Sequence, residues 1–246
     1  MKVKLISHTE DALELLIYTK ETRLSGSNTL QDIKDWPQER KMKQLDYMLK
    51  TIKGAFEFVH YTFEITEVSR AFTHQLVRTR TASFQQESLR AVDARNAGFS
   101  GPDDPLYNAT AKGSFQAYEA LVDEGMPIQD ARGILPIATH TGILMDINLR
   151  NLSQMAELRL CTRTQGEYQE VFKLMKAEIL AIHPWAESLL EVYCVQHGVC
   201  CFPNYTKCPI QPFTLHYTEE KRETIKRRWS ETNHHANPVA KEGRTM

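Results

Sequence analysis

Residues 56–90 read FEFVHYTFEITEVSRAFTHQLVRTRTASFQQESLR, and this stretch decides the fold class. Residues 56–66 are rich in aromatic and β-branched side chains, and Val59, Tyr61, Phe63 and Ile65 alternate onto one face, which predicts a strand. From residue 68 to residue 78 the apolar positions recur at three- and four-residue spacing, which predicts a helix. A strand followed directly by a helix indicates a domain that mixes both types of element.

Toward the N-terminus the same alternation of elements continues. Residues 3–6 form a short apolar run that suits a strand, and Ala12, Leu13, Leu16 and Ile17 then share one helical face. The Ser- and Gly-containing stretch 25–32 predicts a loop, and the apolar spacing over 39–53 predicts a further helix.

Toward the C-terminus the sequence predicts more helices and one more strand. Asp104 and Pro105 are an N-cap and first-turn pair for a helix that ends at Gly125, and a shorter helix is expected over 128–132. Residues 142–148 predict a strand, and the segment that follows predicts a helix from residue 149. Thr164 and Glu167 form a capping-box pattern before a long helix whose inward side chains would be Tyr168, Val171, Phe172, Met175, Ile179 and Ile182.

Pro184 ends that helix, and the spacing of Trp185, Leu189 and Val192 predicts one more. Together these patterns predict an α+β fold with a small, mainly antiparallel sheet flanked by helices. No internal repeat or linker composition marks a second folded part. We therefore expect one catalytic domain over residues 1–202 and a polar C-terminal extension over residues 203–246.

Composition excludes several classes of protein. The 246 residues include 30 basic and 31 acidic side chains, so no global field attracts the chain to nucleic acid or to an acidic membrane surface. No window approaches the roughly 18 apolar residues of a spanning helix, and we do not expect the N-terminal stretch to be a signal sequence. Four of the five cysteines crowd between Cys194 and Cys208, which is not a secreted disulfide framework. We expect a cytoplasmic protein with reduced thiols, no bound metal and no nucleic-acid or membrane partner.

The segment RTRTASFQQESLR, residues 78–90, concentrates groups that bind anions. It holds Arg78, Arg80 and Arg90 together with four hydroxyl side chains. In an extended chain Arg78 and Arg80 would point to the same face, where both guanidiniums could meet one phosphate or diphosphate. The alternative is a solvated basic stretch that pairs with surface carboxylates.

This segment resembles the signature of the flavin-dependent thymidylate synthases, in which Arg-His-Arg is followed after seven residues by Ser-x-Arg. Here the pattern stands as Arg78-Thr79-Arg80, then Ser88 and Arg90. A second block is also similar to that family, namely Ala131-Arg132 with Leu135-Pro136, then Asn148-Leu149-Arg150 and Leu158-Arg159. The resemblance spans about residues 1–200 in the same order. The chain is therefore identified as a divergent member of that family.

The resemblance implies an activity and its cofactors. The expected reaction is flavin-dependent C5 methylation of a pyrimidine nucleotide, dUMP to dTMP, with FAD, NADPH and methylenetetrahydrofolate. It further implies a homotetramer whose active sites are shared between subunits, with Arg78 and Arg159 from different chains. Two alternatives stay open: a related C5 methylase or hydroxymethylase that acts on UMP or dCMP, and a catalytically silent protein that binds FAD or nucleotide.

The resemblance also implies roles for individual residues. Arg159 would stabilise negative charge on the uracil carbonyls, and Ser88 would orient the nucleotide, since no base lies beside it in sequence to activate it as a nucleophile. The expected substrate-binding residues are Gln75, Arg78, Ser88, Arg90, Arg132 and Arg159. The expected cofactor-binding residues are Arg78, Thr79, Arg80, Gln85, Asn148, Arg150, Gln154 and Arg163.

Several positions depart from the family pattern. Thr79 replaces the signature histidine, Arg163 stands where a second histidine usually contacts flavin, and a third histidine expected near Ile52 is missing. Gln85 replaces an asparagine, Ala91 replaces a tyrosine, and Gln86 stands where a glutamate is usual. These changes predict either that the site contacts its ligands through different side chains or that its substrate differs.

Overall fold

The computed structural model describes residues 1–51, 53–200, 202 and 208–209. The chain divides into two compact units, Met1–Val192 and Tyr193–Met246. All predicted site residues belong to the first unit. In the second, the described residues include the short helix α9 (Tyr193–His197). The extension predicted over 203–246 lies outside the described residues except at 208–209, so its boundary stays a prediction.

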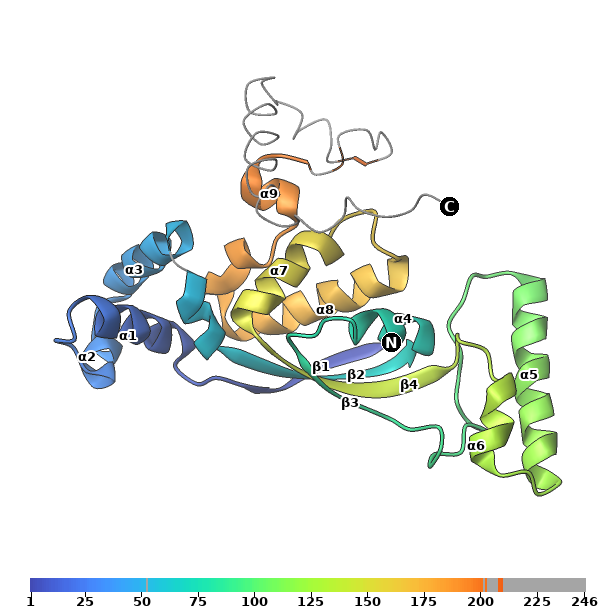
Figure 1. Ribbon diagram of the computed structural model, residues 1–246. Helices are drawn as coiled ribbons and strands as arrows, with labels where there is room; N and C mark the ends of the chain where they lie inside the picture. Colours follow the sequence, from blue (N-terminus) through green and yellow to red (C-terminus); the bar gives the residue numbers. More distant parts are fainter. Residues whose placement is uncertain (52, 201, 203–207, 210–246) are drawn as a thin grey trace, which may run out of the picture. The chain divides into compact units, whose positions relative to one another are not determined.

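One four-stranded sheet organises the first unit, as the sequence predicts (Figure 1). All neighbouring strands pair antiparallel in the order β1-β2-β4-β3. The strands are β1 (Lys2–His8), β2 (His60–Ser69), β3 (Ser83–Gln86) and β4 (His140–Asn148). The expectation of a small antiparallel sheet within an α+β fold is therefore confirmed.

Strand β2 begins at His60 rather than at residue 56, where the sequence places it. Residues Lys53–Phe58 instead form a 3₁₀ helix, η1. Phe56 and Val59 are both fully buried, and their three-residue spacing matches the 3₁₀ period rather than that of a strand. Strand alternation starts only after them, with Tyr61, Phe63 and Ile65 buried.

Three helices cover one face of the sheet (Figure 1): α4 (Arg70–Leu76), α7 (Leu149–Arg159) and α8 (Gly166–Ile182). The predicted inward face of α8 is buried at Tyr168, Val171, Phe172, Met175 and Ile179. Ile182 is 39% exposed, so its predicted inward position was wrong.

The capping box expected at Thr164 and Glu167 does not form. Helix α8 begins after Gln165 without a side-chain cap. The Glu167 carboxylate instead accepts hydrogen bonds from the backbone N–H of Ser69, at 2.7 Å, and from the Ser69 hydroxyl. Ser69 is itself the N-cap of α4, where its hydroxyl accepts from the backbone N–H of Phe72. A long-range contact therefore replaces the local one and joins the starts of α4 and α8.

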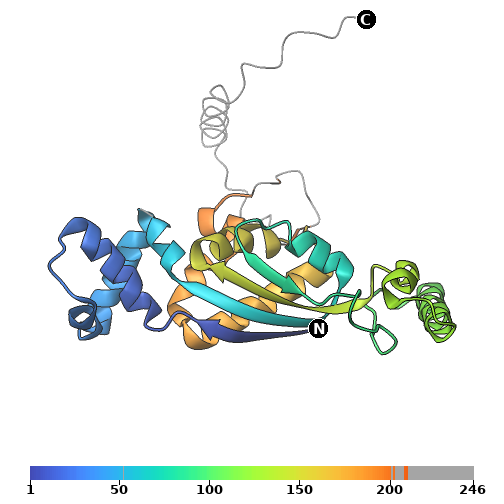
Figure 2. The same cartoon turned by 60° about the horizontal axis from the view of Figure 1, so that its bottom comes forward.

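Two groups of helices lie at opposite ends of the sheet (Figures 1 and 2). One consists of α1 (Ala12–Leu24), α2 (Leu30–Lys34) and α3 (Gln38–Lys50). The other consists of α5 (Pro105–Asp123), α6 (Ile128–Ala131) and the 3₁₀ turn η2 (Arg132–Ile134). The start of α5 is as predicted, since the Asp104 carboxylate accepts a hydrogen bond from the backbone N–H of Tyr107.

Two local predictions were wrong in these regions. The loop expected over 25–32 includes the start of α2, because Thr29 and Asp32 form a capping box. The helix expected after Pro184 is the 3₁₀ helix η3 (Pro184–Leu189), in which Ala186 and Leu189 are buried three residues apart. In the described ranges no helix is both long and apolar enough to cross a membrane.

Candidate active site

The signature segment Arg78–Thr81 forms a turn, not the extended chain expected from sequence. The backbone N–H of Arg78 donates to Gln75 O at 3.3 Å, and that of Thr79 donates to Leu76 O at 3.0 Å. These bonds continue the end of α4 and prevent an extended conformation. Arg78 and Arg80 are exposed, while Thr79 is half-buried between them.

Several predicted residues meet beside this turn, and we call Gln75, Arg78, Thr79, Arg80 and Arg159 the turn cluster. The Gln75 side-chain N–H donates to the Gln165 carbonyl oxygen at 2.5 Å. The guanidinium carbon of Arg159 lies 4.4 Å from the centre of the Tyr168 ring, and the Thr79 hydroxyl lies beside the same phenol. Thr79 and Arg159 are thus neighbours within one chain. Whether Arg78 and Arg159 of different subunits also combine stays a prediction.

Tyr168 is the buried centre of this arrangement. Its ring is fully buried and packs edge-to-face on Phe72 of α4, with 5.0 Å between ring centres. Burial raises the pKa of the Tyr168 phenol, an effect that the Arg159 cation and the Thr79 hydroxyl oppose. The phenol oxygen has no hydrogen-bond partner of good geometry in the described part of the chain. Because its pKa is raised above the usual tyrosine value, the phenol stays protonated and neutral at physiological pH.

Arg70, at the start of α4, bonds to the loop that holds Ser88 and Arg90 and lies near Arg132, and we call these four residues the loop cluster. A terminal N–H of Arg70 donates to the backbone oxygen of Glu87 at 2.9 Å, while its buried Nε has no partner among the described residues. Burial lowers the pKa of Arg70; the Glu87 carboxylate opposes this, and the Arg132 cation adds to it. Two like charges are therefore held near each other.

The sequence reasoning missed Arg70. A signal was available, because a cation in the first turn of a helix opposes the helix dipole and is unfavourable there without another role. Arg70 is the first residue of α4.

A small secondary core positions the Ser88 loop. Leu89 is buried with Ala94, Tyr118 and Ala131, so Ser88 and Arg90 on either side of it face solvent. Ser88 Oγ accepts a hydrogen bond from the backbone N–H of Arg90 at 3.3 Å. In the described ranges no imidazole or carboxylate bonds to the Ser88 hydroxyl, which agrees with a binding role rather than a nucleophilic one.

The start of α7 adjoins the signature turn. The Asn148 side-chain oxygen caps α7 by accepting from the backbone N–H of Asn151 at 2.9 Å, and the Asn151 amide donates to Thr81 O at 3.4 Å. Arg150 forms an exposed ion pair with Glu57, a type of contact that contributes little and that an anionic ligand can replace. Gln154, one turn further along α7, is exposed.

Two predicted cofactor residues do not join this arrangement. Gln85 lies on β3 opposite Leu144, and both are exposed, whereas the next pair along, Phe84 and Met145, faces the helices. Gln85 therefore projects from the sheet face that α4, α7 and α8 leave open. Arg163 is exposed in the connection between α7 and α8.

The arginines at both ends of α4 share an electrostatic property. Within residues 1–51 and 53–200, no carboxylate forms an ion pair with Arg78, Arg80, Arg90, Arg132 or Arg159. By contrast, Arg95 pairs with both Asp93 and Asp123. The alternative of a basic stretch paired with surface carboxylates is therefore not supported for this part of the chain. Unneutralised guanidiniums are suited to bind anions.

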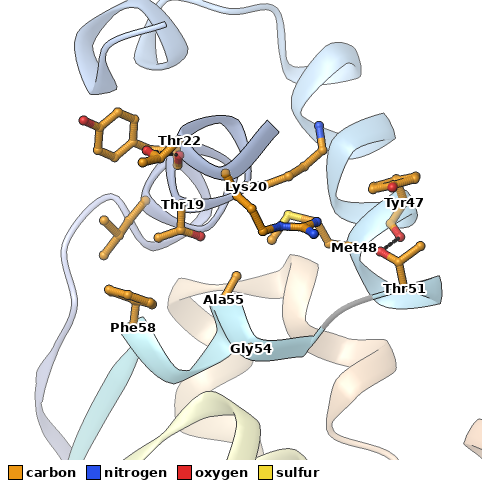
Figure 3. A pocket seen from close by; sticks show the side chains of 12 residues that line it. Thr19, Lys20, Thr22, Tyr47, Met48, Thr51, Gly54, Ala55 and Phe58 are labelled. Atoms are coloured by element: carbon orange, nitrogen blue, oxygen red, sulfur yellow. Dashed lines mark hydrogen bonds between the residues drawn. The ribbon is translucent and has the colours of Figure 1, made fainter. Parts of the chain in front are cut away.

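A cavity of about 440 Å³ lies between α1, α3 and η1 (Figure 3). Aromatic side chains of Tyr18, Tyr47 and Phe58 line it together with Arg23, and Thr51 and Gly54 border it on either side of residue 52. Residue 52 itself lies outside the described residues. Sequence reasoning did not predict this cavity, although the missing family histidine pointed to the same segment.

A family model and curated relatives match most of this chain. The family model described as thymidylate synthase complementing protein matches residues 4–185. The flavin-dependent thymidylate synthase of Pyrococcus furiosus is 31% identical over 244 residues, which cover 92% of this chain and 98% of that one. The chain belongs to the flavin-dependent thymidylate synthase family.

Solved structures show that the family fold extends to this chain. The flavin-dependent thymidylate synthase of Helicobacter pylori, complexed with FAD and dUMP, matches 75% of this chain and 97% of its own, with TM-score 0.63 and 18% identity. A UMP/dUMP methylase from Streptomyces cacaoi, bound with 5-Br dUMP, matches 80% of this chain and 92% of its own, with TM-score 0.56 and 22% identity. The fold expected from the family resemblance is confirmed.

Proposed function

We propose that this member of the flavin-dependent thymidylate synthases converts dUMP to dTMP, with FAD, NADPH and methylenetetrahydrofolate, in the cytoplasm. The observation that carries the proposal is the set of arginines at both ends of α4 that form no ion pair with a carboxylate in the described part of the chain. Helix α4 has seven residues and is therefore about 10 Å long, so the two clusters can hold separate phosphate groups of neighbouring ligands.

The turn cluster fits the diphosphate of FAD. Arg78 and Arg80 are exposed, lie two residues apart and lack carboxylate partners in the described chain, which suits bidentate contacts to phosphate oxygens. Thr79, Asn148 and Arg150 adjoin them and would contact the rest of the cofactor, with Gln154 and Arg163 further along the chain. When bound, FAD supplies the hydride that completes the methyl group. Gln85 would reach FAD only from the open face of the sheet.

The loop cluster suits the nucleotide. Arg132 and Arg90, helped by Arg70, would bind the phosphate of dUMP, and the Ser88 hydroxyl would orient it. Gln75 and Arg159 would meet the uracil ring, where the Arg159 cation stabilises the negative charge that develops as C5 attacks an electrophile. These residues bind, orient and polarise, and none of them needs to act as a nucleophile.

The cavity of Figure 3 suits the folate donor. Its aromatic and apolar lining matches flat heteroaromatic rings, and the Arg23 side chain on its border can meet a glutamate carboxylate of the folate tail. The segment around residue 52, where the family histidine is missing, borders this cavity. The donor would therefore meet a site changed from the family pattern.

We further propose a homotetramer. Leu106 and Ile137 are 77% and 58% exposed, and they border a groove of about 470 Å³ between α5 and residues 136–138. Exposed apolar surface of this kind often marks a contact between subunits. Sedimentation equilibrium should give a mass about four times the 28.3 kDa of one chain. A monomer at micromolar concentration would contradict this proposal.

Product analysis tests the reaction. The protein, loaded with FAD, is incubated with NADPH, methylenetetrahydrofolate and one of dUMP, UMP or dCMP, and the products are identified by mass. We expect dUMP to gain one CH₂. A gain of CH₂O, or turnover only with UMP or dCMP, would replace the substrate assignment.

Bound FAD without turnover of any of the three nucleotides would support the silent binding protein instead. In that case Thr79→His should be tested for restored activity, because Thr79 stands at the signature position that most departs from the family.

A further inference from the structure

Tyr168 lies where four parts of the candidate site meet. It belongs to the first turn of α8, its ring packs on Phe72 of α4, Arg159 at the end of α7 covers the ring, and Thr79 of the signature turn lies at the phenol. The sequence reasoning assigned Tyr168 only to the core. Its neighbours in the structure give it a second role.

The Arg159 guanidinium packs against this ring. It is the last residue of α7, and no carboxylate forms an ion pair with it in the described part of the chain. Its guanidinium carbon lies 4.4 Å from the ring centre, within the range of a cation–π contact. A long arginine side chain has many rotamers, so a contact that selects one of them in advance reduces the entropy lost when a ligand binds.

The phenol hydroxyl contributes little to the stability of this arrangement. It is buried without a hydrogen-bond partner of good geometry among the described residues. Replacing Tyr168 by phenylalanine therefore removes no hydrogen bond of good geometry and keeps the ring. Replacing it by methionine removes the ring and keeps most of the buried volume. Comparing the two variants separates the contribution of the aromatic ring from that of the hydroxyl.

We propose that Tyr168 is a positioning residue, whose ring holds the Arg159 guanidinium beside Thr79 in the place where it meets the pyrimidine ring of the nucleotide. This inference rests on the proposed role of Arg159. It adds a residue to that role and assigns Tyr168 no contact with substrate.

A double-mutant cycle on the FAD-loaded protein tests the inference. The dissociation constant of dUMP and kcat/KM are measured for wild type, Tyr168→Phe, Tyr168→Met, Arg159→Ala and the double variant Tyr168→Met/Arg159→Ala. We expect Tyr168→Met to lower kcat/KM about tenfold and Tyr168→Phe less than about threefold. In the Arg159→Ala background, Tyr168→Met should lower kcat/KM less than about twofold.

Two results of the Tyr168 variants would overturn the inference. One is additivity, in which Tyr168→Met lowers kcat/KM by the same factor in wild type and in the Arg159→Ala background. The other is equal loss of kcat/KM in Tyr168→Phe and Tyr168→Met. Phe172→Leu, at a buried position of the same helix, is the matched control for loosened packing. If it lowers Tm as much as Tyr168→Met does and also lowers kcat/KM tenfold, the role of Tyr168 is only structural.

The outcome of Arg159→Ala separates this inference from the proposed function. If that variant binds and turns over dUMP like wild type, Arg159 has no role for Tyr168 to support, and the inference fails. The mass of the product from wild-type protein still decides the overall reaction in that case.

Discussion

Replacing Arg159 by alanine should lower kcat for dUMP by about 10²–10³-fold, the usual effect of removing one preorganised group that stabilises charge in the transition state. The expected effect is large because Arg159 forms no ion pair in the described chain and its charge is available to the substrate. FAD should remain bound, since the arginines assigned to its phosphates are Arg78 and Arg80. Steady-state kinetics together with the flavin absorbance of the purified variant would measure both quantities.

Arg40 offers a matched control. Its guanidinium carbon lies 3.4 Å from the centre of the Trp36 ring, so Arg40→Ala also removes an arginine stacked on an aromatic ring. Arg40 belongs to α3, and neither cluster nor the cavity lining includes it. We expect wild-type kcat for Arg40→Ala. A wild-type kcat for Arg159→Ala as well would remove Arg159 from the proposed mechanism.

Replacing Arg80 by alanine should weaken FAD binding by about 10- to 150-fold, which corresponds to the loss of a charge-assisted phosphate contact of roughly 1.5–3 kcal/mol. The guanidinium has no carboxylate partner to lose in the described chain, so the effect should appear in ligand binding and not in stability. Titration of the apoprotein with FAD, followed by flavin fluorescence, measures the dissociation constant. The variant should also show a weaker dependence of FAD affinity on salt.

Lys173→Ala is the matched control for an exposed cation. Lys173 lies on α8 and pairs with Glu170 on the surface, so its removal should leave FAD affinity unchanged. Equal FAD retention in Arg80→Ala and wild type would contradict the assignment of Arg80. Wild-type protein that is colourless and takes up no added FAD would overturn the cofactor proposal itself.

The fold could be predicted from sequence wherever the pattern was long and regular. Helix α8, strand β4 and the start of α5 lie close to their predicted positions. The errors occurred where a distant contact overrode a local signal. Glu167 bonds to Ser69, 98 residues away, instead of to Thr164. The chain from Lys53 to Phe58 forms η1 although its aromatic composition suits a strand equally well.

The candidate site could be predicted in part, because its motifs are contiguous in sequence. Thr79 and Arg159 were named in advance, and the structure places both beside one buried tyrosine. Arg70 was missed although its place in the first turn of α4 was a signal. Tyr168 was missed because its contacts to Phe72 and Arg159 come from other elements, and a core tyrosine carries no local signature of such contacts.

Helix α4 is hydrogen-bonded to the start of α8 at both of its ends. Ser69 bonds to Glu167 at its start, and Gln75 bonds to Gln165 at its finish. The loop cluster and the turn cluster therefore lie at the two ends of a short helix, α4, that is hydrogen-bonded at both ends to the start of α8. A ligand that immobilises α4 at one end would also restrict the motion of its other end. The conformational entropy that α4 loses when the first ligand binds would then not be lost again when the second one binds. Such coupling is reciprocal, and cofactor and nucleotide would each raise the affinity of the other by the same factor.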